Sequence, residues 1–236
     1  MFEDLFREGA LAMSGTPVPP LESVFGWGDC LVNRITILAA MVILIIDLQD
    51  MIDISPDLWD CVRRSRGNVS LEHSVSKSRS RNWAAFFCLI PFCLLADRYR
   101  LYPAEWMQSL PLGWSLAAAF GLALFYILFR KVMFLAARPR RIKGETGDAA
   151  FRTLYTFFIF ATAIMLLTAG ILHFFKTGET AIRSVLLWES ALAWAFSTLR
   201  AGQILRTQCS GLTTFLYLCA LEFLPLGLLI AGAVFF

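Results

Sequence analysis

The carboxy-terminal stretch LYLCALEFLPLGLLIAGAVFF, residues 216–236, most limits what this chain can fold into. It is apolar enough and long enough to cross a bilayer, whose hydrocarbon core needs roughly 20 residues of helix. A segment in lipid must satisfy its backbone hydrogen bonds internally, so a helix is expected. Yet the run contains Glu222 and Pro225 well inside it. The sequence therefore predicts a membrane-spanning helix that carries a carboxylate.

Comparable apolar runs recur along the chain, so the whole protein is expected to be membrane-embedded. Hydrophobic residues make up 58% of the sequence and charged residues 17%, and the mean hydropathy is +0.64, above the values typical of soluble domains. We predict an all-α, polytopic bundle of about six transmembrane helices. The predicted spans are residues 35–52, 83–99, 111–135, 151–175, 181–205 and 209–236.

The spans define one transmembrane domain, residues 35–236, which follows a polar amino-terminal tail, residues 1–34. The tail begins with acidic residues and lacks a continuous apolar stretch, so no cleavable signal peptide is expected. The main basic loops are residues 61–82 and 136–150.

The distribution of Lys and Arg predicts the orientation of the bundle. Fifteen of these residues lie in the connections between spans one and two, three and four, and five and six, against six on the opposite side. Cytoplasmic connections are the basic ones in multispanning proteins. The expected location is a bacterial cell inner membrane, with both termini periplasmic.

The small and polar residues of the last span share one helical face with Glu222. At about 100° per residue, the packing face contains Gly211, Thr214, Pro225 and Gly232. Small residues allow a second helix to approach closely, so this face should point into the bundle. Glu222 then lies roughly 16 Å from Gly211, near the middle of the bilayer.

A carboxylate at that depth costs about 2.5–3.5 kcal/mol unless it is paired, protonated or hydrated. We expect an intramembrane polar network of Glu222, Arg200, Glu189 and Arg183. In this network Arg200 reaches towards Glu222, while Glu189 pairs with Arg183 or with a residue of the third or fourth span. Two interpretations stay open: such pairs fix helix packing, or Glu222 titrates and carries protons.

Five aspartates at helical spacing lie around the end of the first span, and two interpretations of them stay open. They are Asp47, Asp50, Asp53, Asp57 and Asp60. They form either the solvated face of a juxtamembrane helix, which we favour, or a cation site. Pro56 is expected to begin a new helical turn capped by Ser55.

Cofactor and catalytic motifs are absent from the sequence. The six cysteines form no CxxC pair and only two histidines are present, so no metal site is predicted. No nucleophile with a base, phosphate loop or nucleic-acid module is recognisable. We predict a protein that is not an enzyme, binds no cofactor and no nucleic acid, and contacts the lipid bilayer. Anionic lipids at the basic loops, a membrane protein partner and a homo-oligomer are the other candidate partners.

The residues around Glu222 also carry a family resemblance. The run LYLCALEFLP, residues 216–225, resembles the carboxy-terminal signature of the bacterial inner-membrane family known as domain of unknown function 4271, typical of Bacteroidota. Phe223 stands where isoleucine is expected. The resemblance implies a multipass, all-helical inner-membrane protein and implies no activity.

Two functional hypotheses follow from the sequence. The first is a noncatalytic assembly, scaffold or partner-binding component whose polar residues pair helices. The second is a small transporter or proton-coupled carrier that uses the intramembrane glutamate; the two halves show no internal repeat of the kind common in carriers. A cavity lined with water around Glu222 would favour the second, and a tight helix contact the first.

Overall fold

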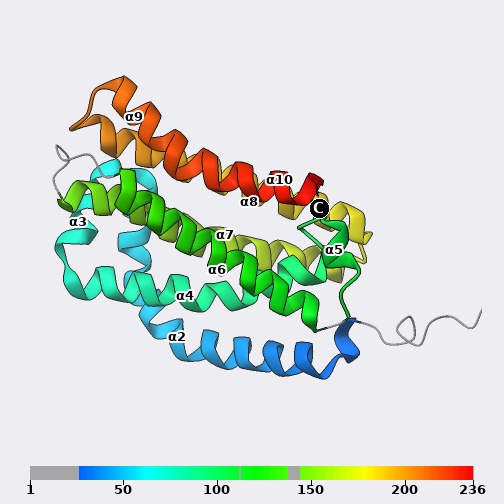
Figure 1. Cartoon of the computed structure of the whole chain (residues 1–236). Helices are drawn as coiled ribbons and strands as arrows, with labels where there is room; N and C mark the ends of the chain where they lie inside the picture. Colours follow the sequence, from blue (N-terminus) through cyan, green and yellow to red (C-terminus); the bar gives the residue numbers. More distant parts are fainter. Residues whose placement is uncertain (1–26, 112, 138–143, 236) are drawn as a thin grey trace, which may run out of the picture.

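The computed structural model describes residues 27–111, 113–137 and 144–235, and the regular structure within these ranges is helical (Figure 1). This confirms the predicted all-α fold. Most of the predicted polar tail (1–26) and the middle of the second basic loop (138–143) lie outside the described residues. The elements are η2 (Trp27–Asp29), α2 (Leu31–Arg63), α3 (Ser65–His73), α4 (Val75–Arg98), α5 (Glu105–Gln108), α6 (Trp114–Ala137), α7 (Gly144–Phe174), α8 (Glu179–Arg206), α9 (Gly211–Leu218), the π-helical turn η3 (Cys219–Phe223) and α10 (Leu224–Phe235).

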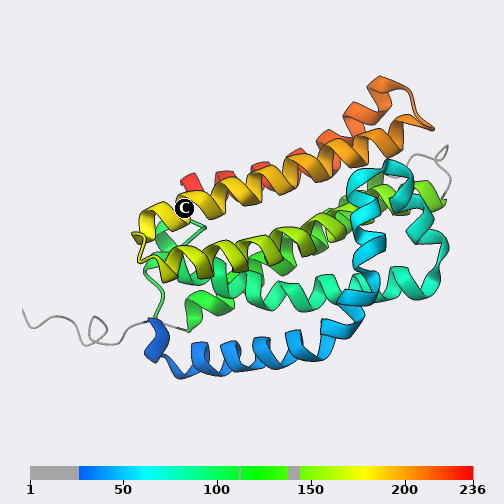
Figure 2. The same cartoon turned by 180° about the vertical axis from the view of Figure 1, so that it is seen from behind.

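The long helices lie side by side in an elongated bundle (Figures 1 and 2). α6 and α7 run through its middle, α4 and the first part of α2 lie on one side, and the hairpin of α8 with α9 and α10 lies on the other. α2 begins and α10 ends at the same end of the bundle, which we call the terminal end. α3, the end of α6, the start of α7 and the turn between α8 and α9 lie at the opposite end, which we call the basic end.

Four helical segments are long and apolar enough to cross a membrane. They are Leu31–Arg63, Trp114–Ala136, Thr146–Phe174 and Gly211–Ala233. The predicted second and fifth spans correspond to α4 and α8, which do not meet this criterion. The first two turns of α4 consist mainly of polar residues, and α8 has charged residues along its whole length. The structure therefore supports four spans by composition rather than the predicted six, although α4 and α8 run along the bundle beside them (Figure 2).

α2 changes direction along its length and lies across the bundle in its second part (Figures 1 and 2). Ile54, Leu58 and Cys61 are buried there against α4 and α7, in one cluster with Cys88 and Ile159. The helix runs through Pro56 without a break. The prediction that Pro56 begins a new turn is therefore wrong, because tertiary packing holds this segment helical on both sides of the proline.

The aspartates of α2 do not all share one environment. Asp50, Asp53 and Asp60 are exposed, and Asp57 forms an ion pair of 2.7 Å with Lys77 of α4. Asp47 instead is buried between helices. The solvated-face interpretation thus fits four of the five residues, and Asp47 is the exception.

The first basic loop, residues 61–82, is not an irregular connection. It contains the end of α2, all of α3 and the first two turns of α4. Gly67 shows how closely α3 folds back: a Cβ on this residue would lie 2.8 Å from the backbone of Asp60. Only glycine permits this approach, so the turn between α2 and α3 depends on it.

Small and hydroxylated residues let α7 pack at the centre of the bundle. Ala149, Ala161, Thr153 and Thr162 are buried on this helix. The two threonine hydroxyls donate to the carbonyls four residues earlier, Thr153 to Ala149 at 2.8 Å and Thr162 to Phe158 at 2.9 Å. Thr side chains satisfied in this way can be buried without an external partner.

Candidate functional site

Glu222 lies on the π-helical turn η3, between α9 and α10. The amide of Leu224 donates to the carbonyl of Cys219, five residues earlier, which is the hydrogen bond of a π turn. Pro225 follows at once and has no amide hydrogen for an ordinary helical bond, and its ring would crowd the preceding turn. The wider turn accommodates the proline, and single π turns of this kind are common at functional sites.

The Glu222 carboxylate forms an ion pair with Arg130 of α6. Glu222 Oε1 accepts from Arg130 Nη2 at 2.5 Å and from Nε at 3.2 Å, and both side chains are only 2% exposed. Arg130 Nη1 donates to the carbonyl of Phe151 of α7 at 2.9 Å, and its guanidinium carbon lies 4.4 Å from the centre of the Phe151 ring. One arginine thus joins α6, α7 and η3.

Packed apolar side chains enclose this pair. Phe134 and Phe151 have ring centres 4.6 Å apart, and Tyr217 and Leu221 are buried in the same cluster. Because both charged side chains are almost fully covered and bonded to each other, Glu222 meets a tight helix contact.

The predicted polar network is not one network in the structure. Arg200 does not reach Glu222: its Nη2 donates to the carbonyl of Val62 at the end of α2, and its Nη1 donates to Gln203 at 2.9 Å. Arg130, within the predicted third span (111–135), takes the place predicted for Arg200. Arg130 is one of the fifteen basic residues assigned to the connections, although its position inside this apolar run was the available signal.

The two remaining members of the predicted network lie on α8. Glu189 accepts a hydrogen bond of 2.8 Å from Thr168 of α7, a residue of the fourth predicted span. Arg183 is half-buried near the start of α8, closer to the terminal end. Glu189 thus joins α8 to α7, and its bond and that of Glu222 are separate.

The predicted packing face of the last span is present along most of its length. Thr214 and Pro225 are buried with Glu222. Gly232 lies against Tyr102, since a Cβ there would be 2.9 Å from the Tyr102 hydroxyl, which donates to the carbonyl of Leu229 at 2.8 Å. Gly211 is exposed, with no described atom within 4 Å of its Cβ position, so its inclusion was wrong. It begins α9 at the basic end, beyond the helix contacts.

A second charged cluster at the basic end was missed by the sequence analysis. Glu72 of α3 accepts from Arg81 of α4 at 2.5 Å and from Arg152 of α7 at 2.9 Å, and Ser78 donates to the same carboxylate at 3.0 Å. Arg81 is fully buried, and burial lowers the pKa of its guanidinium, while the Glu72 carboxylate opposes that shift. Residues that had been treated as topology signals therefore form a structural junction.

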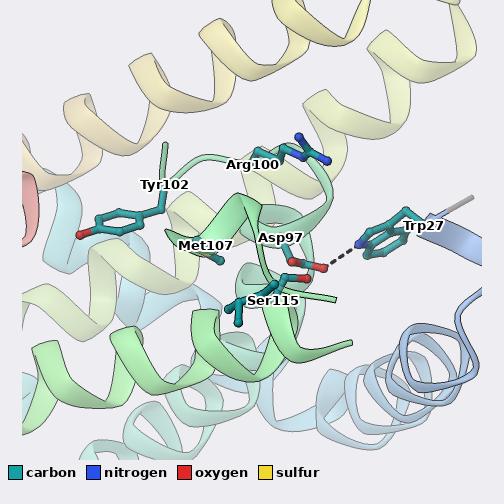
Figure 3. A pocket seen from close by; sticks show the side chains of 7 residues that line it. Trp27, Asp97, Arg100, Tyr102, Met107 and Ser115 are labelled. Atoms are coloured by element: carbon teal, nitrogen blue, oxygen red, sulfur yellow. Dashed lines mark hydrogen bonds between the residues drawn. The ribbon is translucent and has the colours of Figure 1, made fainter. Parts of the chain in front are cut away.

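A small polar cavity of about 60 Å³ lies at the terminal end (Figure 3). Asp97, at the end of α4, is buried there and accepts a hydrogen bond of 2.6 Å from the indole of Trp27. Ser115 of α6 and Tyr102 also line the cavity. Its volume is enough for a few water molecules and too small for an organic substrate.

Within the described ranges, no three His, Cys, Asp or Glu side chains gather closely enough to hold a metal ion, and all six cysteines are free thiols. Comparisons with known protein families, with curated proteins and with solved structures found no match for this chain. The resemblance of residues 216–225 to domain of unknown function 4271 therefore stays a prediction.

Proposed function

We propose that this protein is a noncatalytic assembly, scaffold or partner-binding component of a bacterial inner membrane. The observation that supports the proposal is the Arg130–Glu222 pair, which is enclosed by packed side chains and bonded to three helical elements. A group that holds helices together needs this environment. A group that exchanges ions needs access to water.

In the proposed topology the basic end faces the cytoplasm and both termini are periplasmic. The positive-inside rule supports this topology, because the sequence puts fifteen Lys and Arg residues in the connections assigned to the basic end and six in the others. α4 and α8 are then two further membrane helices that lie against the four apolar ones, giving six. Membership of the family domain of unknown function 4271, which residues 216–225 resemble, is compatible with this arrangement, and we propose it together with the topology.

A proton-coupled carrier is the second candidate, and unpartnered carboxylate oxygens favour it. Among the described residues, Glu222 Oε2, Glu189 Oε2 and Asp47 Oδ2 are buried without a hydrogen-bond partner. Glu222 has its other oxygen on an arginine and Glu189 has its other oxygen on the Thr168 hydroxyl, whereas Asp47 shows no ion pair within the described ranges. Asp47, rather than Glu222, is then the better group to bind a proton inside the bundle.

The structural role predicts the stability of four variants: Glu222→Gln, Glu222→Leu, Arg130→Met and the double variant Glu222→Leu/Arg130→Met. Glu222→Leu leaves Arg130 buried without a counter-charge and should destabilise the protein by about 3–5 kcal/mol. Glu222→Gln keeps an acceptor and should be milder. The double variant should recover much of the loss, since no charge is left unpaired. Unfolding in detergent and the abundance of each variant in membranes measure these effects.

The carrier hypothesis predicts a different pattern. Asp47→Asn should then abolish proton uptake in proteoliposomes while the protein folds and accumulates normally. Normal abundance and stability of Glu222→Leu would overturn the structural role of the Arg130–Glu222 pair.

A further inference from the structure

A surface hollow lies on the first turns of α4. It has a volume of about 380 Å³ and is lined by Arg79, Asn82, Trp83 and Phe86. Successive spacings of three, one and three residues place all four side chains on one face of the helix. The hollow is open to the outside of the bundle.

The lining changes from polar to apolar at one point of α4. Residues 75–82 read VSKSRSRN, and residues 83–90 read WAAFFCLI. Trp83 stands at the change, and tryptophan concentrates where a membrane helix passes from water to lipid. Trp83 and Phe86 are 49% and 55% exposed, which for an aromatic pair at this level indicates contact with lipid. The hollow therefore extends from the headgroup level to the hydrocarbon level.

Arg79 is the basic residue of this stretch that remains available. Lys77 is paired with Asp57, and Arg81 is buried against Glu72. Arg79 is exposed, and the part of the chain that the structure describes shows no ion pair for it. Asn82 accepts a hydrogen bond from Arg81 through Oδ1, so its amide nitrogen can still donate.

We propose that this hollow binds one anionic phospholipid. The phosphate lies on Arg79 and the Asn82 amide, and an acyl chain lies along Trp83 and Phe86. An arginine with an adjacent amide donor matches a phosphate, and the apolar half of the site matches the chain that the phosphate carries. The inference rests on the proposed membrane location of the basic end and is independent of the scaffold or carrier role.

Lipid binding to the full chain in detergent, followed by native mass spectrometry, tests the site. Phosphatidylglycerol is titrated against the wild type, Arg79→Gln, Trp83→Leu and Arg206→Gln. Arg206 is an exposed arginine at the end of α8, outside the hollow, and it provides a control with the same loss of charge. Arg79→Gln should lower the affinity for the most tightly bound lipid about fivefold, as expected for the loss of one charge near a membrane surface. Trp83→Leu should also weaken it, and Arg206→Gln should not.

A second measurement locates the acyl chain. Phosphatidylglycerol with brominated chains should quench tryptophan fluorescence more than brominated phosphatidylcholine at the same mole fraction. That difference should disappear in Trp83→Phe and Arg79→Gln, both of which change exposed residues and should fold.

Two results would overturn the proposal. Equal weakening by Arg79→Gln and Arg206→Gln would show general attraction to a basic surface. Displacement of the lipid by millimolar inorganic phosphate would show a simple anion site in which the chain plays no part. Failure of the membrane location would appear separately, as accessibility of Trp83 to a water-soluble quencher in proteoliposomes.

Discussion

Arg81 and Arg130 are buried arginines that each depend on one glutamate from another helix. Arg130 is held by Glu222, and Arg81 by Glu72, with the carboxylates 2.5 Å away in both cases. A buried charge is tolerated only when a partner and hydrogen bonds compensate it. At the residue scale, these two glutamates are therefore the positions where a single substitution has the largest expected effect.

The Glu72 junction gives a prediction with an internal control. Glu72→Gln leaves Arg81 fully buried without a counter-charge and should lower the free energy of unfolding by about 3–5 kcal/mol. Arg152 contacts the same carboxylate, but its side chain is 35% exposed. Arg152→Gln should therefore cost about 1 kcal/mol or less. Thermal unfolding of both variants in the same detergent makes the comparison, and equal losses would contradict the central role of Arg81.

At the scale of the helix, α4 and α7 end at the terminal end with the same backbone motif. After α4, Leu101 donates to the carbonyl of Ala96 and Arg100 to that of Asp97. After α7, Thr177 and Lys176 repeat these bonds on Leu172 and His173. This is the Schellman ending, whose left-handed position normally holds glycine. Here Arg100 and Lys176 occupy it, with φ of 48° and 54°.

Glycine at this position should stabilise the protein. A side chain in the left-handed conformation costs about 1–2 kcal/mol, and part of that gain is offset by the greater freedom of glycine in the unfolded chain. Lys176→Gly should therefore increase the free energy of unfolding by about 1 kcal/mol or less, which is measured as a higher unfolding temperature. Lys176 is exposed, so no buried contact is lost. The control, Lys176→Ala, removes the same charge but keeps Cβ and should bring no gain.

Over the whole molecule, the helix ends richest in Lys and Arg lie at the end of the bundle opposite to the start of α2 and the end of α10. α2 begins and α10 ends together, and the helices carrying the basic clusters meet at the other end (Figure 1). The fold thereby places the basic connections on one side of any membrane that the bundle crosses, as the orientation argument requires.

Accessibility labelling tests which side that is. In a variant whose half-buried cysteines Cys30, Cys209 and Cys219 are replaced by serine, single cysteines are introduced as Thr180→Cys at the terminal end and Arg206→Cys at the basic end. Both positions are exposed. An impermeant maleimide added to intact cells should label Thr180→Cys, and Arg206→Cys should react only after the membrane is opened. The reverse pattern would invert the proposed topology.

The sequence by itself determined that the chain is a helical bundle with helices long and apolar enough to cross a membrane, and that Glu222 belongs inside the bundle. The long apolar runs predict the helices, because a segment that spans lipid has few alternatives to a helix. The face shared by Thr214, Glu222 and Pro225 predicts that Glu222 points into the bundle, because residues of one helix have a fixed angular relation to one another.

Only the tertiary structure decided which groups meet. Glu222 pairs with Arg130, 92 positions away, and Arg200 goes to the carbonyl of Val62. The turn of α2 across the bundle, the burial of Asp47 and the Glu72–Arg81 junction also follow from how helices pack around one another. Periodicity fixes the angle of a side chain around its own helix, but the neighbour it faces depends on the order, tilt and depth of all the helices, and those are set by packing between them.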